Sequence, residues 1–349
     1  MLSAAVFASV VSLGAGAQIQ AGDHTIAAVS DERIRHVNSL QTTWTAGRPS
    51  RFNNATVADL KRMLGTFLPH EDGAPDYVPP EKTAAMFTTA DSDIPEAFDV
   101  RTNWPECAAI SGMVRDQSNC GSCWAFGSTE AFNDRHCIAT GDTKSILSPE
   151  DTLECCYMNS KGCSGGYISG AWRWFKLEGV STGGNYEDIG KGTTCKPYSM
   201  QSCAHHTDDV PAGYVPCEDV PDYSTPKCAT SCSEPDYPTP YASEKLKAKS
   251  EYSIRGESNM QKELMEKGSL SAGFTVYEDF PEYTSGVYHH VTGRKLGGHA
   301  IKIVGWGVDA GVPYWTCINS WNDVWGEQGS FRIQRGECGI EDDVVAGDV

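Results

Sequence analysis

The sequence predicts a mixed α+β fold with a helical part ahead of a strand-rich part. A helical apolar pattern follows directly after Cys123, with apolar residues at 124–126, 131 and 132. A strand pattern begins at His299 and continues over 300–304. A chain of 349 residues is long enough for one large or two modest folded units. We therefore expect the helix and the strand to lie in two halves of one structure.

The composition excludes several classes of protein. Hydrophobic residues make up 40% of the chain and charged residues 21%, so the chain can bury enough apolar surface to fold. The 28 basic and 46 acidic residues give a net charge of −18. Nucleic acids and anionic membranes bind basic patches, so neither is expected as a partner. No apolar run beyond the N-terminus is long enough to span a membrane.

The first 17 residues are typical of a signal peptide. Residues 2–17 are apolar and small, and Ala15, Gly16 and Ala17 form the small-x-small pattern of a cleavage site. The alternative is a buried helix at the start of the fold. The 14 cysteines of the chain favour secretion, because disulfides persist in oxidising compartments. Secretion makes Asn54, which begins an Asn-Ala-Thr triplet, a candidate for glycosylation.

Residues 18–93 differ from the rest of the chain because they contain no cysteine. A helical apolar pattern spans 56–68, and a Pro- and Asp-rich stretch over 69–93 is typical of an extended linker. We interpret 18–93 as a pro-region and 94–349 as the mature domain. The alternative is a small N-terminal domain that stays attached.

The motif QSNCGSCW at 117–124 carries the strongest chemical signal in the sequence. Cys123 begins the predicted helix, where unpaired N–H groups and the helix dipole favour a thiolate. The alternatives are two structural half-cystines or a redox pair. At 297–307, GGHAIKIVGWG places His299 at the start of a strand, where it could accept and return a proton. Asn319, in Asn-Ser-Trp, could hold the imidazole in one tautomer.

Together these motifs resemble the papain family of cysteine proteases, in its cathepsin B-like branch. The resemblance covers 94–349 almost continuously. It extends into the pro-region through TTWTAG at 42–47, LKR at 60–62 and GTFL at 65–68. It implies a two-subdomain fold, with a helical N-terminal subdomain and an antiparallel, β-barrel-like C-terminal subdomain, made as a full-length precursor.

The resemblance also implies roles for single residues. Cys123 corresponds to the nucleophile, His299 to its proton partner and Asn319 to the residue that orients the histidine. Gln117 corresponds to the oxyanion-hole side chain. Trp321 corresponds to the tryptophan that shields the contact between His299 and Asn319.

The spacing of the catalytic motifs indicates an insertion. Cys123 and His299 lie 176 positions apart, whereas about 130–150 are expected for papain-like enzymes. The Cys- and Pro-rich stretch at about 195–240 corresponds to an occluding loop at the primed end of the cleft. By resemblance, His205 and His206 receive the C-terminal carboxylate of a substrate, so that dipeptides are removed from C-termini. The alternative for this pair is a solvated loop or an adventitious metal site.

The anchoring of this loop departs from the family pattern. Asp116 preserves a partner for His205. A second ion pair of the family is expected to be lost, because Tyr214 and Val324 stand at its two positions. We expect a loop that opens more easily and relatively more endopeptidase activity.

On the non-primed side, Gly165 and Gly166 correspond to the strip that an extended substrate approaches closely. By resemblance, the walls and floor of the main specificity pocket are Tyr167, Gly273, Ala300 and Asp343. Asp343 implies tolerance of Arg as well as apolar residues at the second position before the cut. The alternative is that Asp343 faces solvent.

The family implies five disulfides. They are Cys107–Cys137, Cys120–Cys163, Cys155–Cys228, Cys195–Cys232 and Cys203–Cys217. Cys156 is free or paired in a way that the sequence does not define, and Cys317 and Cys338 are expected to be buried thiols.

The expected partners are peptide and protein substrates, the chain's own pro-region and cystatin-type inhibitors, with a monomeric enzyme. Neither a cofactor nor a metal is expected. The chain is expected in the secretory pathway, in a lysosome or similar acidic vacuole, or outside the cell. Two rival hypotheses are a catalytically dead binding module and a disulfide-rich structural protein. The order Gln, Cys, His, Asn argues against both.

Overall fold

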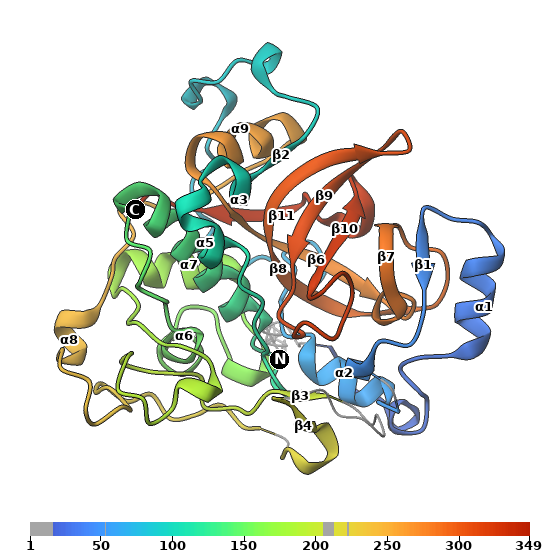
Figure 1. Ribbon diagram of the computed structural model, residues 1–349, viewed down its shortest axis with the longest axis horizontal. Coiled ribbons are helices and arrows are strands. Elements are labelled where there is room, and N and C mark those ends of the chain that lie inside the picture. The colour runs from blue at the N-terminus through green and yellow to red at the C-terminus, as the bar shows by residue number, and fades with distance from the viewer. Residues whose placement is uncertain (1–16, 53, 205–212, 222) are drawn as a thin grey trace, which may run out of the picture.

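The computed structural model describes residues 17–52, 54–204, 213–221 and 223–349. Within them a helical half and a sheet half face each other across a seam (Figure 1). None of the helices in these ranges has the length and apolarity to cross a bilayer. The helices are α1 (Asp31–Ser39), α2 (Val57–Met63), α3 (Val100–Asn103), α4 (Ala108–Ser111), α5 (Cys123–Thr140), α6 (Pro149–Cys155), α7 (Ile168–Leu177), α8 (Tyr241–Glu244) and α9 (Glu257–Lys267).

The main sheet has nine strands. Its order is β1-β7-β10-β9-β8-β6-β11-β5, and β2 pairs with β8. The strands of both sheets are β1 (Trp44–Ala46), β2 (Phe98–Asp99), β3 (Cys203–Ala204), β4 (Val215–Pro216), β5 (Tyr252–Ser253), β6 (Leu270–Tyr277), β7 (Tyr283–Tyr288), β8 (Lys295–Asp309), β9 (Val312–Ile318), β10 (Ser330–Gln334) and β11 (Asp343–Ala346). The strands β3 and β4 form a separate parallel pair inside the inserted loop.

The expected α+β fold, with a helical half and a strand-rich half, is confirmed. The β-barrel-like description of the strand-rich half needs two corrections. The strand order is an open path from β1 to β5, and no pairing within the described chain joins its ends. In addition, β7 and β10 run parallel. The pro-region covers both edges of this open path. It supplies β1 to one edge, and its residue Glu81 forms a bridge to Ser253 at the other edge, so both edges are already covered.

Close packing between α5 and β8 brings the two halves together. Gly127 of α5 faces the backbone of Ile301, and a Cβ at Gly127 would lie 3.0 Å from the Ile301 carbonyl oxygen. A larger residue would push the helix away from the strand that carries His299. The helix is buried over 123–137, and it ends where Gly141 adopts a left-handed conformation with φ of 75°. The first residue of α5 therefore lies against the seam.

The pro-region helix predicted over 56–68 is correct only in its first part. The helix α2 ends at Met63, after Thr56 caps its N-terminus. The chain then becomes extended because Gly65 packs on the backbone of Gly121, where a Cβ would lie 1.8 Å from the Gly121 carbonyl oxygen. The sequence also missed α1, in which only Val37 is buried and the apolar periodicity is correspondingly weak.

The structure pairs ten cysteines. Its disulfides are Cys107–Cys137, Cys120–Cys163, Cys155–Cys228, Cys195–Cys232 and Cys203–Cys217, the same five that the resemblance implies. Cys123, Cys156 and Cys317 are buried thiols. Cys338 corrects the expectation of burial, because it lies half-buried in a tight turn with φ of 53°.

Candidate active site

The sulfur of Cys123 lies at the N-terminus of α5, where the helix dipole favours a negative charge. The residue is fully buried. Burial alone raises the pKa of the thiol, but the charge and the hydrogen bond of His299, together with Thr66 and the Ala300 backbone, lower the pKa to about 7. The thiol can therefore ionise near neutral pH.

Three other free thiols provide a comparison within the same chain. Burial raises the pKa of Cys156 to about 12, and it raises the pKa values of Cys317 and Cys338 well above the ordinary range. For none of these three thiols is an imidazole among the groups that shift the pKa. Of the four unpaired cysteines, Cys123 alone has its pKa lowered, and this marks it as the reactive sulfur.

The imidazole of His299 is held in place from two sides. Its Nε2 lies 2.7 Å from Oδ1 of Asn319, and the Trp321 ring lies 4.6 Å from the imidazole, centroid to centroid. His299, Asn319 and Trp321 are fully buried. Since Oδ1 of Asn319 can only accept, Nε2 must carry a proton. Nδ1 makes no conventional hydrogen bond within the described residues, so this nitrogen remains for the thiol proton.

Gln117 lies beside this pair, and its amide is fixed from both ends. Its Oε1 accepts a hydrogen bond from the Ser320 hydroxyl at 2.7 Å, and the two carbonyl oxygens at its other end, which can only accept, identify that end as the donor. Its Nε2 donates to the carbonyl oxygens of Cys120, at 2.7 Å, and of Met63, at 2.9 Å. The Met63 carbonyl belongs to the pro-region. The donor expected to bind an oxyanion is thus already engaged by a carbonyl oxygen.

The pro-region passes through the seam as an extended segment. The Gly65 N–H and the Thr66 hydroxyl lie 3.3 and 3.2 Å from Sγ of Cys123. The N–H of Thr66 donates to the Gly298 carbonyl oxygen, and Gly166 donates to the Gly65 carbonyl oxygen at 2.8 Å. The segment therefore pairs with backbone on both walls of a cleft, directly over the sulfur.

A pocket beyond the thiol receives Leu68 of the pro-region. Gly273 and Ala300 pair on neighbouring strands, and a Cβ at Gly273 would lie 2.9 Å from Cδ2 of Leu68 and 3.1 Å from Oδ2 of Asp343. Leu68 and Asp343 thus share the space over Gly273. Tyr167 borders the same region but contacts Phe67, at 5.3 Å between ring centroids.

Asp343 points into this pocket rather than into solvent. The residue is 8% exposed, and its Oδ2 has no hydrogen-bond partner within the described residues. Burial, with a smaller contribution from Asp342, raises the pKa of Asp343 to about 7. With Leu68 in the pocket, the carboxyl is neutral in acid and ready to ionise beside a cation.

The comparisons with known proteins agree with this geometry. The model described as papain family cysteine protease matches residues 94–347, and the model described as peptidase family C1 propeptide matches residues 29–70. The chain belongs to the papain family of cysteine proteases.

Relatives narrow the assignment within this protease family. The chain is 44% identical to cathepsin B-like cysteine proteinase 5 of Caenorhabditis elegans, over 90% of this chain and 88% of that one. It is 42% identical to cathepsin B-like cysteine proteinase 4 of the same organism, over 98% of both chains. This protease is therefore a cathepsin B-like cysteine peptidase with a propeptide.

Solved structures show the same zymogen arrangement. The procathepsin B S9 of Trypanosoma congolense is 30% identical, with a TM-score of 0.75 over 92% of this chain and 99% of that one. The digestive procathepsin L 3 of Tenebrio molitor, with a TM-score of 0.63 and 17% identity, shares the fold. The propeptide of this peptidase thus acts as an intramolecular inhibitor in the seam.

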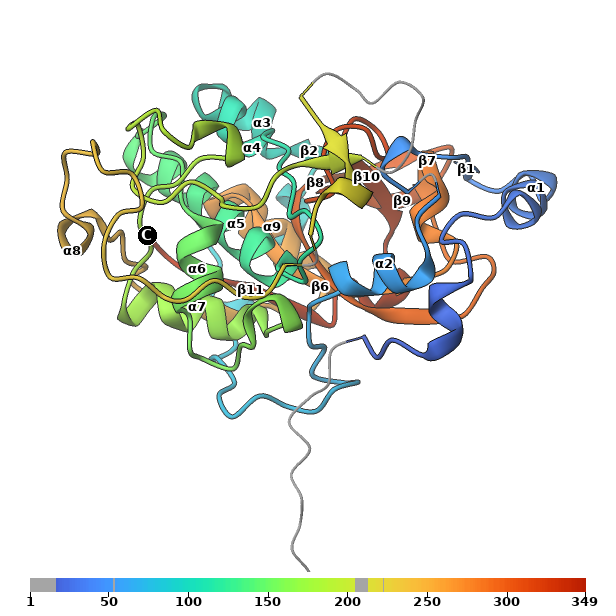
Figure 2. The same cartoon turned by 90° about the horizontal axis from the view of Figure 1, so that it is seen from below.

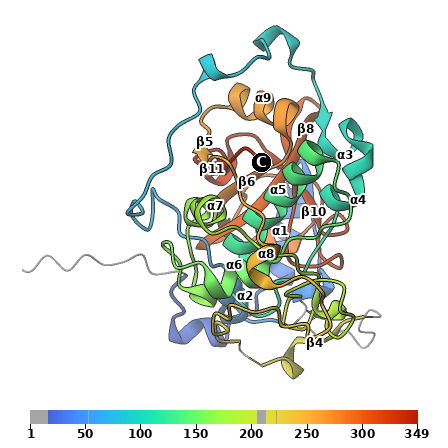
Figure 3. The same ribbon diagram turned by 90° about the vertical axis from the view of Figure 1, so that its left-hand side faces the viewer.

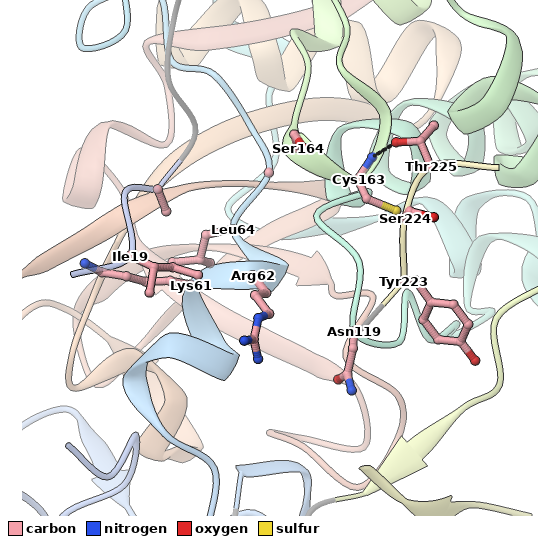
Figure 4. Close-up of a pocket in the computed structure, with 12 residues that line it drawn as sticks. Ile19, Lys61, Arg62, Leu64, Asn119, Cys163, Ser164, Tyr223, Ser224 and Thr225 are labelled. Atoms are coloured by element: carbon pink, nitrogen blue, oxygen red, sulfur yellow. Dashed lines mark hydrogen bonds between the residues drawn. The ribbon is translucent and has the colours of Figure 1, made fainter. Parts of the chain in front are cut away.

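The pro-region does not fill the cleft of the protease completely. A cavity of about 700 Å³ remains between α2 and the mature domain, bordered by Leu64 on one side and by Cys163 and Thr225 on the other (Figure 4). The Thr225 hydroxyl accepts a hydrogen bond from the Cys163 N–H at 2.9 Å. Because Thr225 lies in the inserted stretch at 195–240, the insertion reaches the glycine strip as well as the opposite end of the cleft.

On the primed side, the base of the inserted loop is held by Asp116. Its carboxylate accepts hydrogen bonds from the N–H groups of Ser118, at 2.7 Å, and Cys203, at 3.1 Å, and from the Asn322 amide at 2.9 Å. The pro-region adds a buried cation, because Nη2 of Arg51 lies 3.7 Å from the same carboxylate. His205 and His206, the predicted carboxylate receptors, lie outside the described residues.

Among the described residues no ion pair stands at Tyr214 or Val324, in line with the expected loss, but a hydrogen bond that the sequence did not predict anchors the loop there. Asp323 directly precedes Val324, and the Tyr214 hydroxyl donates to Oδ1 of Asp323 at 2.7 Å. A neutral donor on a carboxylate thus takes the place of an ion pair. A hydrogen bond to a charged group is stronger than one between neutral groups, so the loop keeps an anchor.

Sequence reasoning missed several residues at the site. Thr66 contacts the thiol, Ser320 fixes the amide of Gln117, and Arg51 lies buried against the Cys203–Cys217 disulfide. Ser320 was already part of the Asn-Ser-Trp motif, and Asp323 stands two positions after Trp321, so both could have been found by inspecting that motif's neighbours. Nothing local to Arg51 indicates its long-range partners.

Proposed function

We propose that Cys123 and His299 form the thiolate–imidazolium pair that cleaves peptide bonds, with Asn319 orienting the imidazole and Trp321 shielding their contact. The observation that carries this proposal is the lowered pKa of Cys123 beside a histidine whose Nε2 is fixed 2.7 Å from Asn319. The Cys123 thiolate attacks the carbonyl carbon, and the backbone N–H of Cys123 and Nε2 of Gln117 stabilise the oxyanion. Imidazolium then protonates the leaving amine, and water hydrolyses the thioester with His299 as base.

The direction of the pro-region explains how it blocks the site without being cleaved there. Gly65 lies at the thiol and Leu68, three residues later, lies in the pocket. A substrate whose second residue before the cut fills this pocket would pass the pocket first and the thiol afterwards. The pro-region therefore runs in the opposite sense, and its Met63 carbonyl engages Gln117.

We propose that the pocket of Tyr167, Gly273 and Ala300 binds either an apolar side chain or Arg. Leu68 shows that an apolar side chain fits the pocket. Oδ2 of Asp343, which has no hydrogen-bond partner among the described residues, favours binding of a cationic side chain. A guanidinium in the pocket would stabilise the ionised carboxylate and lower its pKa. Gly165 and Gly166 would pair with the substrate backbone as they do with the pro-region.

For the primed side we propose removal of C-terminal dipeptides by the inserted loop, alongside cleavage of internal bonds. His205 and His206 would receive the substrate carboxylate when protonated. The proposal is supported by the disulfide, the Asp116 contacts and the Tyr214 anchor that fix the base of the loop. His205→Ala should raise the ratio of internal cleavage to dipeptide removal in acid. The same ratio in the variant and the wild-type enzyme at every pH would overturn the proposed role of His205.

We propose that the precursor loses residues 1–17 as a signal peptide and is cut near Ile94 to release residues 94–349. Residues 90–93 are exposed, which supports cleavage there. Asn54 is also exposed and accessible to glycosylation. The enzyme would be delivered to an acidic vacuole or to the cell exterior. It would act as a monomer, and cystatin-type proteins would inhibit it.

The test is to acidify the purified full-length chain, sequence its new N-terminus and identify the products of a defined peptide. We expect an N-terminus near Ile94, dipeptides from the C-terminus of the peptide, and labelling of Cys123 by an epoxide probe. A chain that releases no product and leaves Cys123 unlabelled would contradict the proposal.

A further inference from the structure

The linker segment, residues 77–91, does not hang free between the cleft and the mature domain. It crosses a surface formed by α9, β5 and the end of α7 (Figure 3). We call this surface the linker face and define it by the mature-domain residues that bind the segment: Arg173, Glu251, Ser253, Lys262, Glu263 and Glu266. Within the described chain, no hydrogen bond or ion pair joins these residues to Cys123, His299 or Asn319.

The first element of the linker face is a sheet edge. β5 is the last strand of the nine-stranded sheet. The N–H of Lys82 donates to the Ser253 carbonyl oxygen at 2.9 Å, and the N–H of Ser253 donates to the Pro80 carbonyl oxygen at 3.0 Å. Together these bonds make a parallel bridge at Glu81. The segment thus adds to the sheet edge in the way that extended peptides bind such edges.

The second element is a slot for a lysine side chain. Lys82 is 6% exposed, and its Nζ lies 2.6 Å from Oε2 of Glu263. The same Nζ lies 4.8 Å from the centre of the Tyr252 ring and 4.7 Å from that of Phe87. Removing an ammonium group from water is costly, so a buried lysine requires a carboxylate and aromatic faces of this kind.

The carboxylate and one aromatic face of the slot, Glu263 and Tyr252, belong to the mature domain, whereas the Phe87 ring belongs to the linker itself. Oε1 of Glu263 accepts hydrogen bonds from Nη2 of Arg135, at 2.8 Å, and from the Tyr252 hydroxyl, at 2.7 Å. Burial acts to raise the pKa of Glu263, but Arg135 and Lys82 outweigh it and lower the pKa. Without Lys82, Arg135 still balances the buried carboxylate, and Oε2 becomes available to another cation.

Contacts on both sides of the slot define the length of the bound segment. The Tyr77 hydroxyl donates to Glu251 at 2.6 Å, and the Arg173 guanidinium lies 3.7 Å from the centre of the Tyr77 ring. Toward the other end, the N–H groups of Thr88 and Thr89 both donate to Oε1 of Glu266 at 2.7 Å. The linker face therefore holds an extended chain at several points, and the buried lysine lies between them.

We propose that the linker face of the processed enzyme is an exosite that binds an extended, lysine-bearing segment of a protein substrate, with the lysine on Glu263 and the backbone on β5. This proposal rests on the proposed function, because processing must remove the linker before another segment can bind. Residues 94–349 hold 21 basic and 36 acidic residues, so the processed enzyme has a net charge of −15, which favours basic segments over acidic ones.

The binding test uses the acid-processed enzyme, with Cys123 blocked by an epoxide, and a fluorescent peptide with the sequence of residues 76–91. We expect saturable binding and protection of the Ser253 amide from hydrogen exchange. Lys82→Met in the peptide should weaken binding by about tenfold or more, because a charged hydrogen bond is lost. The matched control is Glu81→Gln, whose side chain is 46% exposed and pairs only with the exposed Arg255; exposed pairs contribute little, so this peptide should bind about as the parent peptide does.

The functional test adds the unlabelled peptide to active enzyme. It should slow cleavage of a lysine-rich unfolded protein, reduced and carboxymethylated lysozyme, and leave cleavage of a short fluorogenic peptide unchanged. The Lys82→Met peptide should slow neither reaction. Slowing of both reactions would place the peptide in the cleft and overturn the exosite.

Three other results would overturn the proposal. They are equal binding by the Lys82→Met and parent peptides, absence of binding by either, and retention of the linker by the processed enzyme. Each leaves the proposed peptidase function intact, because Cys123 labelling and cleavage of the short peptide report that function separately. Conversely, a chain without peptidase activity could still bind the linker peptide once its own linker is removed.

Discussion

The two ends of the cleft are built in different ways. The non-primed end consists of backbone and strands: Gly166 pairs with the pro-region, Gly273 and Ala300 lie on paired strands, and Cys120–Cys163 ties the glycine strip to the start of α5. At the primed end an inserted loop is held by polar side chains, with Asp116 and Tyr214 as its main anchors. Figure 2 shows this loop, with β3 and β4, on the opposite side of the molecule from the linker.

This difference separates two properties of the enzyme. The helix α5 sets the position of the thiol, the sheet sets the imidazole and the proposed specificity pocket, and this packed core resists small changes. A few hydrogen bonds set the position of the loop, and each contributes only about 1–3 kcal/mol. Peptide-bond cleavage and pocket selectivity should therefore be robust, whereas the proposed balance between dipeptide removal and internal cleavage should respond to single substitutions.

The largest effect is expected at the seam that both ends share. Cys123→Ser should lower kcat/KM by roughly 10⁴-fold or more for dipeptide removal and internal cleavage alike, because the nucleophile is lost. The matched control is Cys156→Ser, at a buried thiol whose pKa is raised. Rates are measured on one substrate of each kind. Loss of one activity without the other would show that the two do not share a nucleophile.

The next effect tests the non-primed pocket. The raised pKa of Asp343 means that its carboxyl is neutral below about pH 7 and ionised above. Preference for Arg over Phe at the second residue before the cut should therefore rise with pH, while titration of Cys123 and His299 cancels in the ratio. Asp343→Asn should lower this preference by about tenfold and abolish its pH dependence.

The control for this prediction is Asp342→Asn, which changes the exposed neighbouring carboxyl; it should keep the preference for Arg and only move its pH dependence to lower pH, because Asp342 helps to raise the pKa of Asp343. The measurement is the ratio of kcat/KM values for paired Arg and Phe substrates, taken across the pH range for both variants and the wild-type enzyme. A ratio that stays the same in Asp343→Asn would place Asp343 outside the specificity pocket.

A third prediction concerns the pro-region at the primed end. Arg51→Met removes the buried cation beside Asp116, while Asp116 keeps its three neutral donors. Active enzyme should appear about tenfold faster after acidification, because the pro-region is held less tightly. Arg48→Met, at an exposed side chain paired with Asp31, should leave the rate unchanged. Equal activation rates for the two variants would refute an anchoring role for Arg51.

The smallest effect tests the loop anchor. Tyr214→Phe removes the donor to Asp323, so the loop should open more often and the ratio of internal cleavage to dipeptide removal should rise about threefold. Tyr157→Phe, at an exposed tyrosine bonded to Glu178, is the matched control. Both ratios are measured on one blocked and one free-C-terminus peptide. An unchanged ratio in Tyr214→Phe would mean that Asp116 and the disulfide suffice to hold the loop.

Much of this site could be predicted from the chemistry of short sequence motifs. A cysteine at the start of an apolar helical pattern, a histidine at the start of a strand and the Asn-Ser-Trp motif each point to a role through their immediate neighbours. The five disulfides came from the resemblance, since spacing alone cannot define pairing. The error in the helix at 56–68 has a tertiary cause, because Gly65 leaves the helix to pack on Gly121, far away in the sequence.

By itself, the sequence determined the reactive residue types, their order along the chain and the division into a Cys-free segment and a Cys-rich domain. Only the tertiary structure decided that Met63 engages Gln117, that Arg51 lies beside Asp116, that Tyr214 reaches Asp323 and that Lys82 is buried on Glu263. The physical reason is that each of these contacts joins residues far apart in the chain, and a polar side chain in a loop carries no local signal of the partner that folding will bring to it.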